Sequence, residues 1–422
     1  MDKMLEENMK MSFRNQLRGE RMNLKSFITD DEIIAIAQKL ISIQSHKDHE
    51  LKESEVAIWI KNYLEKEGIE SNIDEVEKNR PNVYGQLIGE NEGIELLLSG
   101  HTDTILGFNM DYPPFQPFIK DGKLYGRGSA DMKGGIAAMI AAMAAVKRSN
   151  VSLSNGVMFA GVIDEEERSK GTEHLIKKNI NAKMAIIGEP TQLKVCTAHK
   201  GMEWIEVTFK GRAVHASRPH EGINAIYTAT EFIKMVKDEL QPKIESNKFD
   251  LLGSGTINVG VIRGGDEPNI VCDNCSIRID RRWLPNETLK SIHDEIKIVA
   301  QKAVDLVGGS FEMRSMSEYT ASMSNSPHNI QPNHPLVLQA INSVMEVTGK
   351  LEKPSAFPAW SDAALLSNYM GTGCIILGPG NINQAHANDE FCDIDQIIQA
   401  AHIYMDIIEK LCIKEKNKEQ KK

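Results

Sequence analysis

The sequence has no excess of basic residues and no long apolar run. Its 49 Lys and Arg residues are outnumbered by 59 Asp and Glu residues, which gives a formal net charge of -10. An acidic chain of this kind is repelled by nucleic acid and by anionic membrane surfaces, so neither is expected as a partner. The best apolar run, Ile136 to Val146, is Ala-rich and too short to span a bilayer, so it predicts a buried helix.

Cysteine is scarce, and the sequence begins without the apolar stretch of a secretory signal. The opening residues are polar and mixed in charge, which does not fit an exported precursor. Six cysteines in a chain of 422 residues indicate reduced thiols and therefore a cytoplasmic protein. Cys272 and Cys275 form a CxxC pair, but a zinc ribbon needs a second pair, so we expect both to be strand residues.

A chain of 422 residues is too long to fold around a single hydrophobic core, so at least two domains are expected. Several short apolar runs alternate with helical patterns: Ile94 to Leu98, Val157 to Ile163, Met184 to Ile187 and Cys374 to Leu377. Such runs suit strands buried on both faces of a mixed, largely parallel sheet, and their alternation with helices predicts an α/β domain.

Two helices are predicted ahead of these strands. The first carries apolar residues from Ile33 to Ile41 at helical spacing, and Asp30 or Asp31 is suited to cap it. The second runs through Val56 to Leu64.

The middle of the chain has a different pattern, in which the strands are half exposed. The stretch Gly201 to Lys210 alternates apolar and polar residues, as a strand with one buried face does. It is followed by a helix at 223–240, strands at 255–263 and 276–283, a helix at 289–307 and a strand holding Phe311 and Met313. The order βαββαβ predicts a ferredoxin-like lid and dimerisation domain at 199–319, inserted into a larger catalytic domain formed by 23–198 and 320–414.

Acidic and histidine residues follow each apolar run of the larger domain. His101 and Asp103 follow the first run, Asp164, Glu165 and Glu166 the second, Glu189 the third and His386 the fourth. In open α/β sheets, ligands bind at the carboxyl ends of the strands. We therefore expect these side chains to converge on one crevice.

Asp131 lies just ahead of the Ala-rich helix, in the segment GRGSADMKGG, and joins this group. Taken singly, Asp131 is most simply a helix cap, and each of the other segments a turn or a solvated loop. Together they would place many charges in one crevice, which is costly unless cations neutralise them. Two divalent ions would do so, and these ligands suit Zn²⁺, with Co²⁺ or Mn²⁺ as alternatives.

Eight segments occur along the chain in a fixed order: SGHTDT, YGRGSADMKGG, DEEERSKG, GEPT, GRAVHASRPHEGINAI, GGDEPNIVCD, IDRR and GPGNINQAH. In that order they resemble the M20 family of metallopeptidases and aminoacylases, over nearly the whole chain after residue 30. GEPT and HASRPHEGINAI are most similar to its acetylornithine deacetylase and succinyl-diaminopimelate desuccinylase branch. The resemblance implies a metal-dependent amidohydrolase that removes an acyl group from a small N-acyl amino acid.

The resemblance also implies a role for each residue near the metals. Asp131 would bridge the two ions, with a cis peptide bond to Met132, as in relatives. The other ligands would be His101 and Glu189 for one ion and Glu166 and His386 for the second. Glu165 would be the general base, and Asp103 would orient the His101 imidazole.

Three residues of the inserted domain match positions with a catalytic or substrate-binding role in the family. His215 matches a histidine that reaches into the partner subunit's active site in family dimers, where it would stabilise the tetrahedral oxyanion. Asn269 and Arg282 match lid residues that contact the substrate, Arg282 at its carboxylate. The resemblance therefore implies a homodimer.

The sequence leaves alternatives to this function open. A di- or tripeptidase or a carboxypeptidase of the same family is the first alternative, and the motifs do not exclude it. Two departures from the family bear on the substrate: Cys272 replaces a common proline, and Ala359 to Asp362 replaces a glycine-rich stretch near the pocket. A catalytically dead binding protein is less favoured because Glu165 is present. A nucleotide-binding protein is set aside because Gly126 and Gly128 lack the rest of a phosphate-binding motif.

Overall fold

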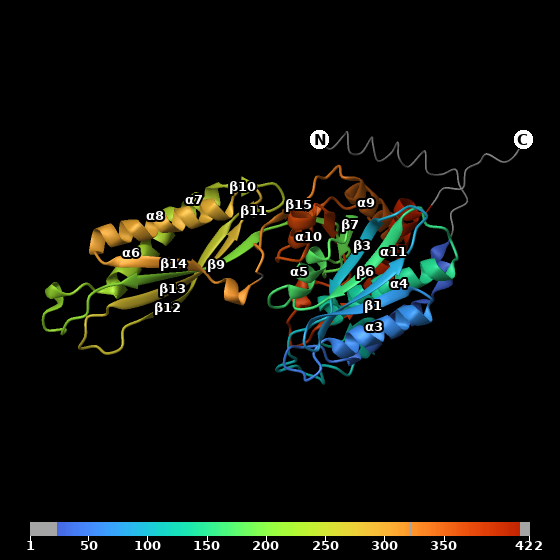
Figure 1. Ribbon diagram of the computed structural model, residues 1–422, viewed down its shortest axis with the longest axis horizontal. Coiled ribbons are helices and arrows are strands. Elements are labelled where there is room, and N and C mark those ends of the chain that lie inside the picture. The colour runs from blue at the N-terminus through green and yellow to red at the C-terminus, as the bar shows by residue number, and fades with distance from the viewer. Residues whose placement is uncertain (1–22, 321, 414–422) are drawn as a thin grey trace, which may run out of the picture.

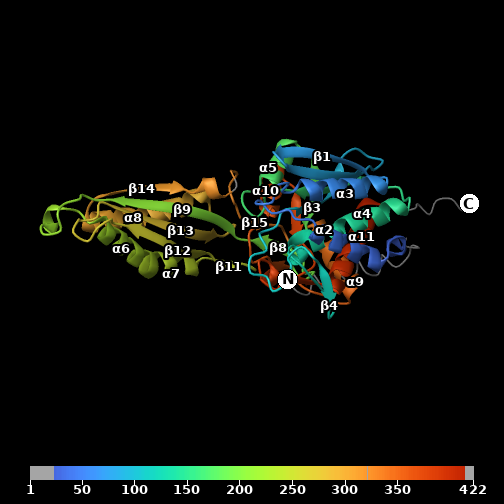
Figure 2. The same cartoon turned by 90° about the horizontal axis from the view of Figure 1, so that it is seen from below.

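The computed structural model describes residues 23–320 and 322–413 of the chain. Two lobes lie side by side along the longest axis (Figure 1). The large lobe is built from both ends of the described chain, and the small lobe is built from its middle. Turning the molecule by 90° leaves the lobes separate (Figure 2), so each has its own sheet and its own core.

The large lobe contains a mixed sheet in the order β1-β2-β6-β3-β7-β17-β8-β15, with β16 paired to β8. The strands are β1 (Glu70–Glu77), β2 (Arg80–Leu87), β3 (Ile94–His101), β6 (Gly156–Val162), β7 (Ala182–Ile187), β8 (Cys196–His199), β15 (His328–Asn329), β16 (Ser355–Ala356) and β17 (Gly373–Ile376). The central strands β6, β3, β7 and β17 are mutually parallel, and β2, β8 and β15 are joined antiparallel. The predicted runs therefore form the parallel centre of the sheet.

Helices cover both faces of this sheet. The first face carries α2 (Asp30–Ser42), α3 (Ser54–Lys66), α4 (Gly134–Arg148), α9 (Pro335–Thr348) and α11 (Ile394–Cys412), preceded by the short helix η1 (Leu24–Phe27). The second face carries α5 (Lys170–Lys177) and α10 (Ala363–Met370). Leu96 and Leu98 pack into the first core and Leu97 into the second, as the two-residue period of a strand requires.

The segment through η2 (Ser129–Lys133) and α4 is longer than the apolar run that the sequence predicted. By length and composition, residues 129–148 are sufficient to cross a membrane, which corrects the expectation that no stretch would be. However, its most apolar window is wholly buried inside the protein. Asp131 and Met132 also depart from helical backbone angles, so the regular helix is only about 22 Å long. It is the core helix of the large lobe.

The small lobe is a four-stranded antiparallel sheet with helices on one side. Its strands are β9 (Gly201–Lys210), β12 (Thr256–Gly264), β13 (Asn274–Trp283) and β14 (Ser310–Ser315), in the order β12-β13-β9-β14. Its helices are α6 (Ala225–Met235), η4 (Val236–Leu240), α7 (Gln241–Ser246) and α8 (Leu289–Val307), and β10 (Lys248–Phe249) pairs with β11 (Gly253–Ser254). This confirms the α/β fold class with a ferredoxin-like βαββαβ unit.

Some local predictions need correction. Thr29, and neither Asp30 nor Asp31, caps α2, because its hydroxyl accepts the Glu32 N–H. The first small-lobe helix begins at Ala225, because the Asn224 side chain accepts a backbone N–H there. Cys272 precedes β13 and only Cys275 lies within it.

The chain crosses between the lobes twice. Lys200 joins β8 to β9, and residues 316–327 lead from β14 back to β15. His199 and His328 are paired across β8 and β15 at these crossings, and both imidazoles are buried. A smaller sheet of β18 (Phe391–Asp393), β5 (Lys123–Tyr125) and β4 (Phe118–Lys120) borders the large lobe.

Candidate active site

The predicted site residues follow the carboxyl ends of neighbouring parallel strands. His101 is the last residue of β3, and it is in register with Val162 at the end of β6. Glu165 and Glu166 follow within a few residues. Glu189 follows β7, whose last residue, Ile187, pairs with Ser99 of β3. Because these strands are parallel and adjacent, their ends meet at one edge of the sheet.

Asp131 lies at the centre of this edge. It belongs to η2, and the peptide bond between Asp131 and Met132 is cis, which confirms that expectation. One carboxylate oxygen, Oδ1, lies 3.0 Å from Nε2 of His101. The other, Oδ2, lies 3.5 Å from Nε2 of His386. Each carboxylate oxygen therefore faces a different imidazole, which is the arrangement that a ligand shared between two ions needs.

The remaining acids complete two groups around Asp131. Glu189 Oε1 lies 3.8 Å from His101 Nε2, and Glu166 Oε2 lies 2.9 Å from His386 Nε2. Ligand atoms of His101, Asp131 and Glu166 lie within 4.8 Å of one another, as do those of His101, Glu165 and Glu189. The structure thus brings all five predicted metal ligands and Glu165 into one cluster.

Asp103 connects two parts of this cluster. Its backbone carbonyl lies 3.0 Å from Nδ1 of His101, and its carboxylate lies 3.6 Å from the same nitrogen. A proton on Nδ1 donated to these oxygens leaves the Nε2 lone pair facing the acids, as a metal-binding imidazole requires. The Asp103 carboxylate also accepts the N–H groups of Glu165, at 3.3 Å, and Glu166, at 3.1 Å. It therefore orients both the imidazole and the glutamate loop.

The charges of the cluster perturb one another strongly. Burial raises the pKa of Glu165 and of Glu189 well above the ordinary value, and repulsion from neighbouring carboxylates adds to the rise. Burial lowers the pKa of His101, but the hydrogen bonds that its ring donates to Asp103 and Asp131 raise that pKa well above normal. A buried group of acids with this much mutual repulsion fits divalent cations, because cations would neutralise it.

A further carboxylate, Asp362, lies close to the cluster and was not assigned from the sequence. It is buried, and Thr172 Oγ1 donates to its Oδ2 at 2.6 Å. Burial raises the pKa of Asp362 to about 6. Its charge also contributes to the raised pKa values of Glu165 and Glu189. Asp362 precedes helix α10 rather than following a strand, so the strand-end pattern gave no signal for it.

Asp164 follows the same strand as Glu165 but faces another direction. Its carboxylate lies 2.5 Å from Nη1 of Arg80, whose Nη2 lies 2.5 Å from Oε1 of Glu53. All three side chains are buried. This ion-pair network anchors the loop after β6, so Asp164 supports the site without joining it.

The predicted catalytic residue His215 and the predicted substrate-binding residue Asn269 lie far from the acid cluster. His215 is in the loop 211–224 between β9 and α6, and it forms a β-bridge with Ile270, next to Asn269. Both His215 and Asn269 are exposed. The ten residues of β9 lead away from the lobe crossing at about 3.3 Å per residue, which places this loop roughly 30 Å from it. The loop lies at the end of the small lobe remote from the large lobe (Figure 1).

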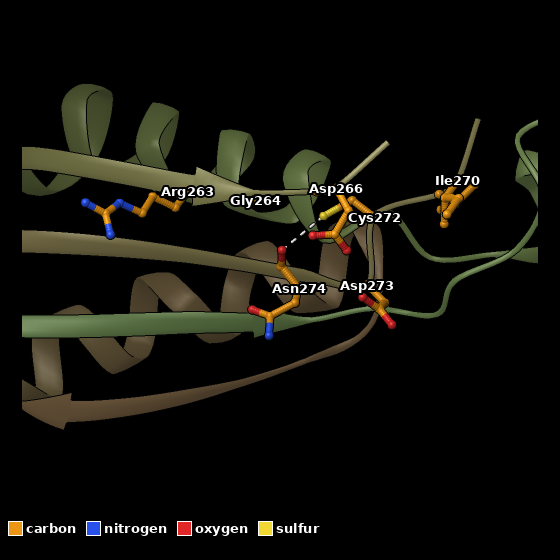
Figure 3. A pocket seen from close by; sticks show the side chains of 9 residues that line it. Arg263, Gly264, Asp266, Ile270, Cys272, Asp273 and Asn274 are labelled. Atoms are coloured by element: carbon orange, nitrogen blue, oxygen red, sulfur yellow. Dashed lines mark hydrogen bonds between the residues drawn. The ribbon is translucent and has the colours of Figure 1, made fainter. Parts of the chain in front are cut away.

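A hollow of about 400 Å³ lies at this same end of the small lobe (Figure 3). It is lined by residues between Arg263 and Asn274, including the carboxylates of Asp266 and Asp273 and the Cys272 thiol. Cys272 Sγ donates to the Asn274 carbonyl at 3.0 Å. None of the clustered metal-ligand candidates lines it, so it is separate from the candidate active site.

Arg282 lies at the opposite end of the small sheet, beside the lobe crossing. It is one residue from the end of β13 and pairs with Met202 near the start of β9. Its guanidinium donates to Asp280 at 2.8 and 3.0 Å, and the side chain is one-third exposed. The structure therefore separates Arg282 from His215 and Asn269 by the length of the sheet.

Comparison with known proteins identifies a family and relatives that have similar sequences. Residues 97–410 match the family described as peptidase family M20/M25/M40. An acetylornithine deacetylase from Pasteurella multocida is 32% identical over 333 residues, covering 77% of this chain and 82% of that protein. A probable succinyl-diaminopimelate desuccinylase from Staphylococcus epidermidis is 28% identical over 412 residues, covering 90% and 98%.

A solved structure supports the fold. The crystal structure of a dinuclear metal-binding peptidase of the M20 family from Bacillus subtilis matches with a TM-score of 0.69 at 14% identity. The match covers 92% of this chain and 98% of that one. Because the family match spans well over half of the chain, the chain belongs to peptidase family M20/M25/M40 and is a hydrolase that acts on amide bonds.

Proposed function

We propose that this chain is a two-metal amidohydrolase that removes an acyl group from a small N-acyl amino acid. The observation that carries the proposal is the position of Asp131, with one carboxylate oxygen toward His101 and the other toward His386. The similarity to an acetylornithine deacetylase and to a probable succinyl-diaminopimelate desuccinylase supports the substrate class.

The ligand geometry supports two ions that share Asp131. His101 and Glu189 would complete the set of one ion, and Glu166 and His386 the set of the other. Each set combines one imidazole with carboxylates, which suits Zn²⁺, Co²⁺ or Mn²⁺, and we propose Zn²⁺. The similarity to a dinuclear metal-binding peptidase supports the binding of two ions.

Bound ions of this kind would acidify a water molecule and polarise the amide carbonyl. Glu165 belongs to the same cluster of side chains, beside His101 and Glu189. It would take the proton of the attacking water and deliver it to the leaving amine nitrogen. Asp103 would keep His101 in its binding tautomer throughout, because its oxygens face Nδ1.

We further propose that the small lobe, within the limits 199–319, is a lid and dimerisation domain between the catalytic segments 23–198 and 320–414. His215 would stabilise the oxyanion in the partner subunit's active site. Asn269 lies beside His215 and would contact the same substrate. Arg282 lies near the subunit's own crossing and would bind the substrate carboxylate. The distal position of His215 supports a dimer, because its own site is remote.

A cytoplasmic location is also proposed. All six cysteines are free and buried in the structure. Reduced, packed thiols are typical of proteins in a reducing compartment.

A di- or tripeptidase or a carboxypeptidase is the second candidate. The similarity in fold to a dinuclear metal-binding peptidase is consistent with it. The segment Ala359 to Asp362, which departs from the family, also provides a buried carboxylate whose charge acts on Glu165 and Glu189. A catalytically dead relative is less favoured, because Glu165 lies within the ligand cluster.

A substrate panel tests the proposal. The zinc-loaded protein is assayed with N-acetyl, N-succinyl and N-formyl amino acids beside di- and tripeptides, with chelator-treated protein as the control. We expect turnover of an N-acyl amino acid that is lost with the metal and restored by Zn²⁺. Faster turnover of peptides would establish the second candidate instead. Absence of metal-dependent turnover of every compound would contradict both.

A further inference from the structure

Glu390 is a fully buried glutamate that lies four residues after His386 and just ahead of β18. Its carboxylate contacts the segment that leads into Asp131, about 260 residues earlier in the chain. Oε1 accepts the N–H groups of Ala130, at 3.0 Å, and Asp131, at 3.2 Å. Oε2 accepts the N–H of Gly128 at 3.1 Å and Nη1 of Arg127 at 2.6 Å.

The segment around Asp131 needs such a partner because its backbone is irregular. Gly128 has a φ of +84°, a left-handed conformation that favours glycine. Asp131 and Met132 depart from helical angles, so the N–H groups here cannot all join a regular helical ladder. A buried N–H without an acceptor is costly, and Glu390 accepts three of them with one side chain.

The same contacts connect the two halves of the metal-ligand cluster. Asp131 belongs to the segment that Glu390 holds, and His386 belongs to Glu390's own loop. The distance of 3.5 Å between Asp131 Oδ2 and His386 Nε2 depends on how these two loops are joined. His386 is the least enclosed member of the cluster, with a side chain 53% exposed, so packing alone fixes it less firmly than it fixes His101.

We propose that Glu390 is a positioning residue that sets the spacing of Asp131 and His386 and thereby the affinity for the second metal ion. This inference rests on the proposed two-metal site. Glu390 itself is directed at backbone N–H groups and Arg127, so it acts through Asp131 and His386.

The substitution Glu390→Gln tests this role with little change in shape. It replaces one of the two acceptor oxygens by an NH₂ group, which then faces N–H donors whichever way the amide is turned. The loops stay joined by the backbone, because the Glu390 carbonyl still accepts the Gly126 N–H. The expected result is a change of spacing at the site in a folded protein.

The measurement is a Zn²⁺ titration of chelator-stripped protein against a competing chromophoric chelator. We expect two equivalents for the wild type, and for Glu390→Gln a weakening of the second equivalent by about 10- to 100-fold, the range for residues that orient metal ligands. Glu173→Gln is the matched control. Glu173 is also buried and accepts the N–H of a distant residue, Met323, at 3.0 Å, but it lies outside the ligand cluster found among the described residues. It should keep both equivalents.

The outcomes separate this inference from the proposed function. Wild-type protein that binds fewer than two equivalents would overturn the two-metal site and, with it, the role of Glu390. Two tight equivalents in both the wild type and Glu390→Gln would overturn the role of Glu390 alone, as would an equal loss in Glu173→Gln. If Glu390→Gln does not fold, Glu390→Asp, which keeps the charge but shortens the reach, carries the same test, with unchanged affinity as the contradicting result.

Discussion

The edge of the large-lobe sheet and the far end of the small lobe contain the two sets of residues that the family resemblance links to catalysis, and they differ sharply. At the sheet edge, His101 and Glu189 are 1% and 4% exposed, and parallel strands hold the ligand-bearing loops side by side. At the far end, His215 and Asn269 are exposed on loops, and the short polar contact of His215 is with Ser217, two residues away.

This difference indicates which part of the proposed mechanism is preformed. The acids and imidazoles already face one another within a single chain, so the proposed metal binding would need only this lobe. The proposed oxyanion contact of His215 would have to come from another subunit or from movement of the lobes. Variants of the two regions should therefore affect different measurements.

The largest effect is expected at the sheet edge. Glu165→Gln should lower kcat by about 10²- to 10⁴-fold, because a general base contributes that much. Its metal content should stay intact, because the five ligands remain. Glu166→Gln should instead lose affinity for one ion. Steady-state kinetics together with metal analysis checks this, and equal metal loss in both variants would contradict the division of roles.

At the far end, His215→Ala should lower kcat by about 10²- to 10³-fold, as removal of one oxyanion donor does. Both metal equivalents should remain, because His215 lies outside the ligand cluster. A normal kcat in His215→Ala would contradict this role. It would mean that catalysis does not need His215 at the far end of the small lobe.

A mixing experiment sharpens the same comparison. Inactive Glu165→Gln and inactive His215→Ala are dissociated and reassociated together. A mixed dimer has one site with an intact Glu165 and the partner's intact His215, so roughly a quarter of wild-type activity should return on random pairing. If mass spectrometry shows that the subunits have exchanged and no activity returns, His215 does not act across subunits.

A smaller effect is expected for Arg282, near the lobe crossing. Arg282→Ala should raise KM about 10- to 100-fold for a substrate with a free carboxylate, because a charged hydrogen bond contributes about 1.5–3 kcal/mol. Arg278→Ala is the control, because Arg278 is on the same face of β13 and pairs with Glu206. For a substrate amidated at that carboxylate, the wild type and Arg282→Ala should have the same KM. An equal rise of KM in both variants would assign Arg282 a structural role only.

The smallest effect concerns the lobe crossing itself. Burial and the neighbouring His328 lower the pKa of His199 to about 3, and burial lowers that of His328 to about 4. Below pH 6.5 the unfolded chain binds protons that the folded chain excludes, so stability falls as pH decreases from 6.5 toward 4. Each histidine should cost about 2 kcal/mol between pH 7 and 5.

His199→Asn isolates this contribution. The Asn amide is suited to replace Nδ1 as donor to the Lys200 carbonyl, which lies 2.9 Å away. Denaturant unfolding at pH 7 and pH 5 should show a smaller loss of stability in the variant than in the wild type. An identical pH dependence would mean that His199 is not buried at an ordered crossing.

The sequence alone predicted the parallel strands, the alternating small-lobe strands and the acids after the strand ends, because strand periodicity and strand-end placement are local properties. The α/β fold class and the family followed from the same segments. Local rules failed only at details such as the cap of α2, where Thr29 and the two aspartates after it are all good capping residues.

Other features were decided only by the tertiary structure. The contact of Glu390 with Asp131 joins residues 259 apart, and the approach of Asp362 to Glu165 has no strand-end signal. No periodic pattern relates such positions, because their proximity depends on how the whole sheet is assembled. The remoteness of His215 from the acids is likewise a consequence of β9 leading away from the crossing, since strand direction in space is set by pairing with β13 and β14.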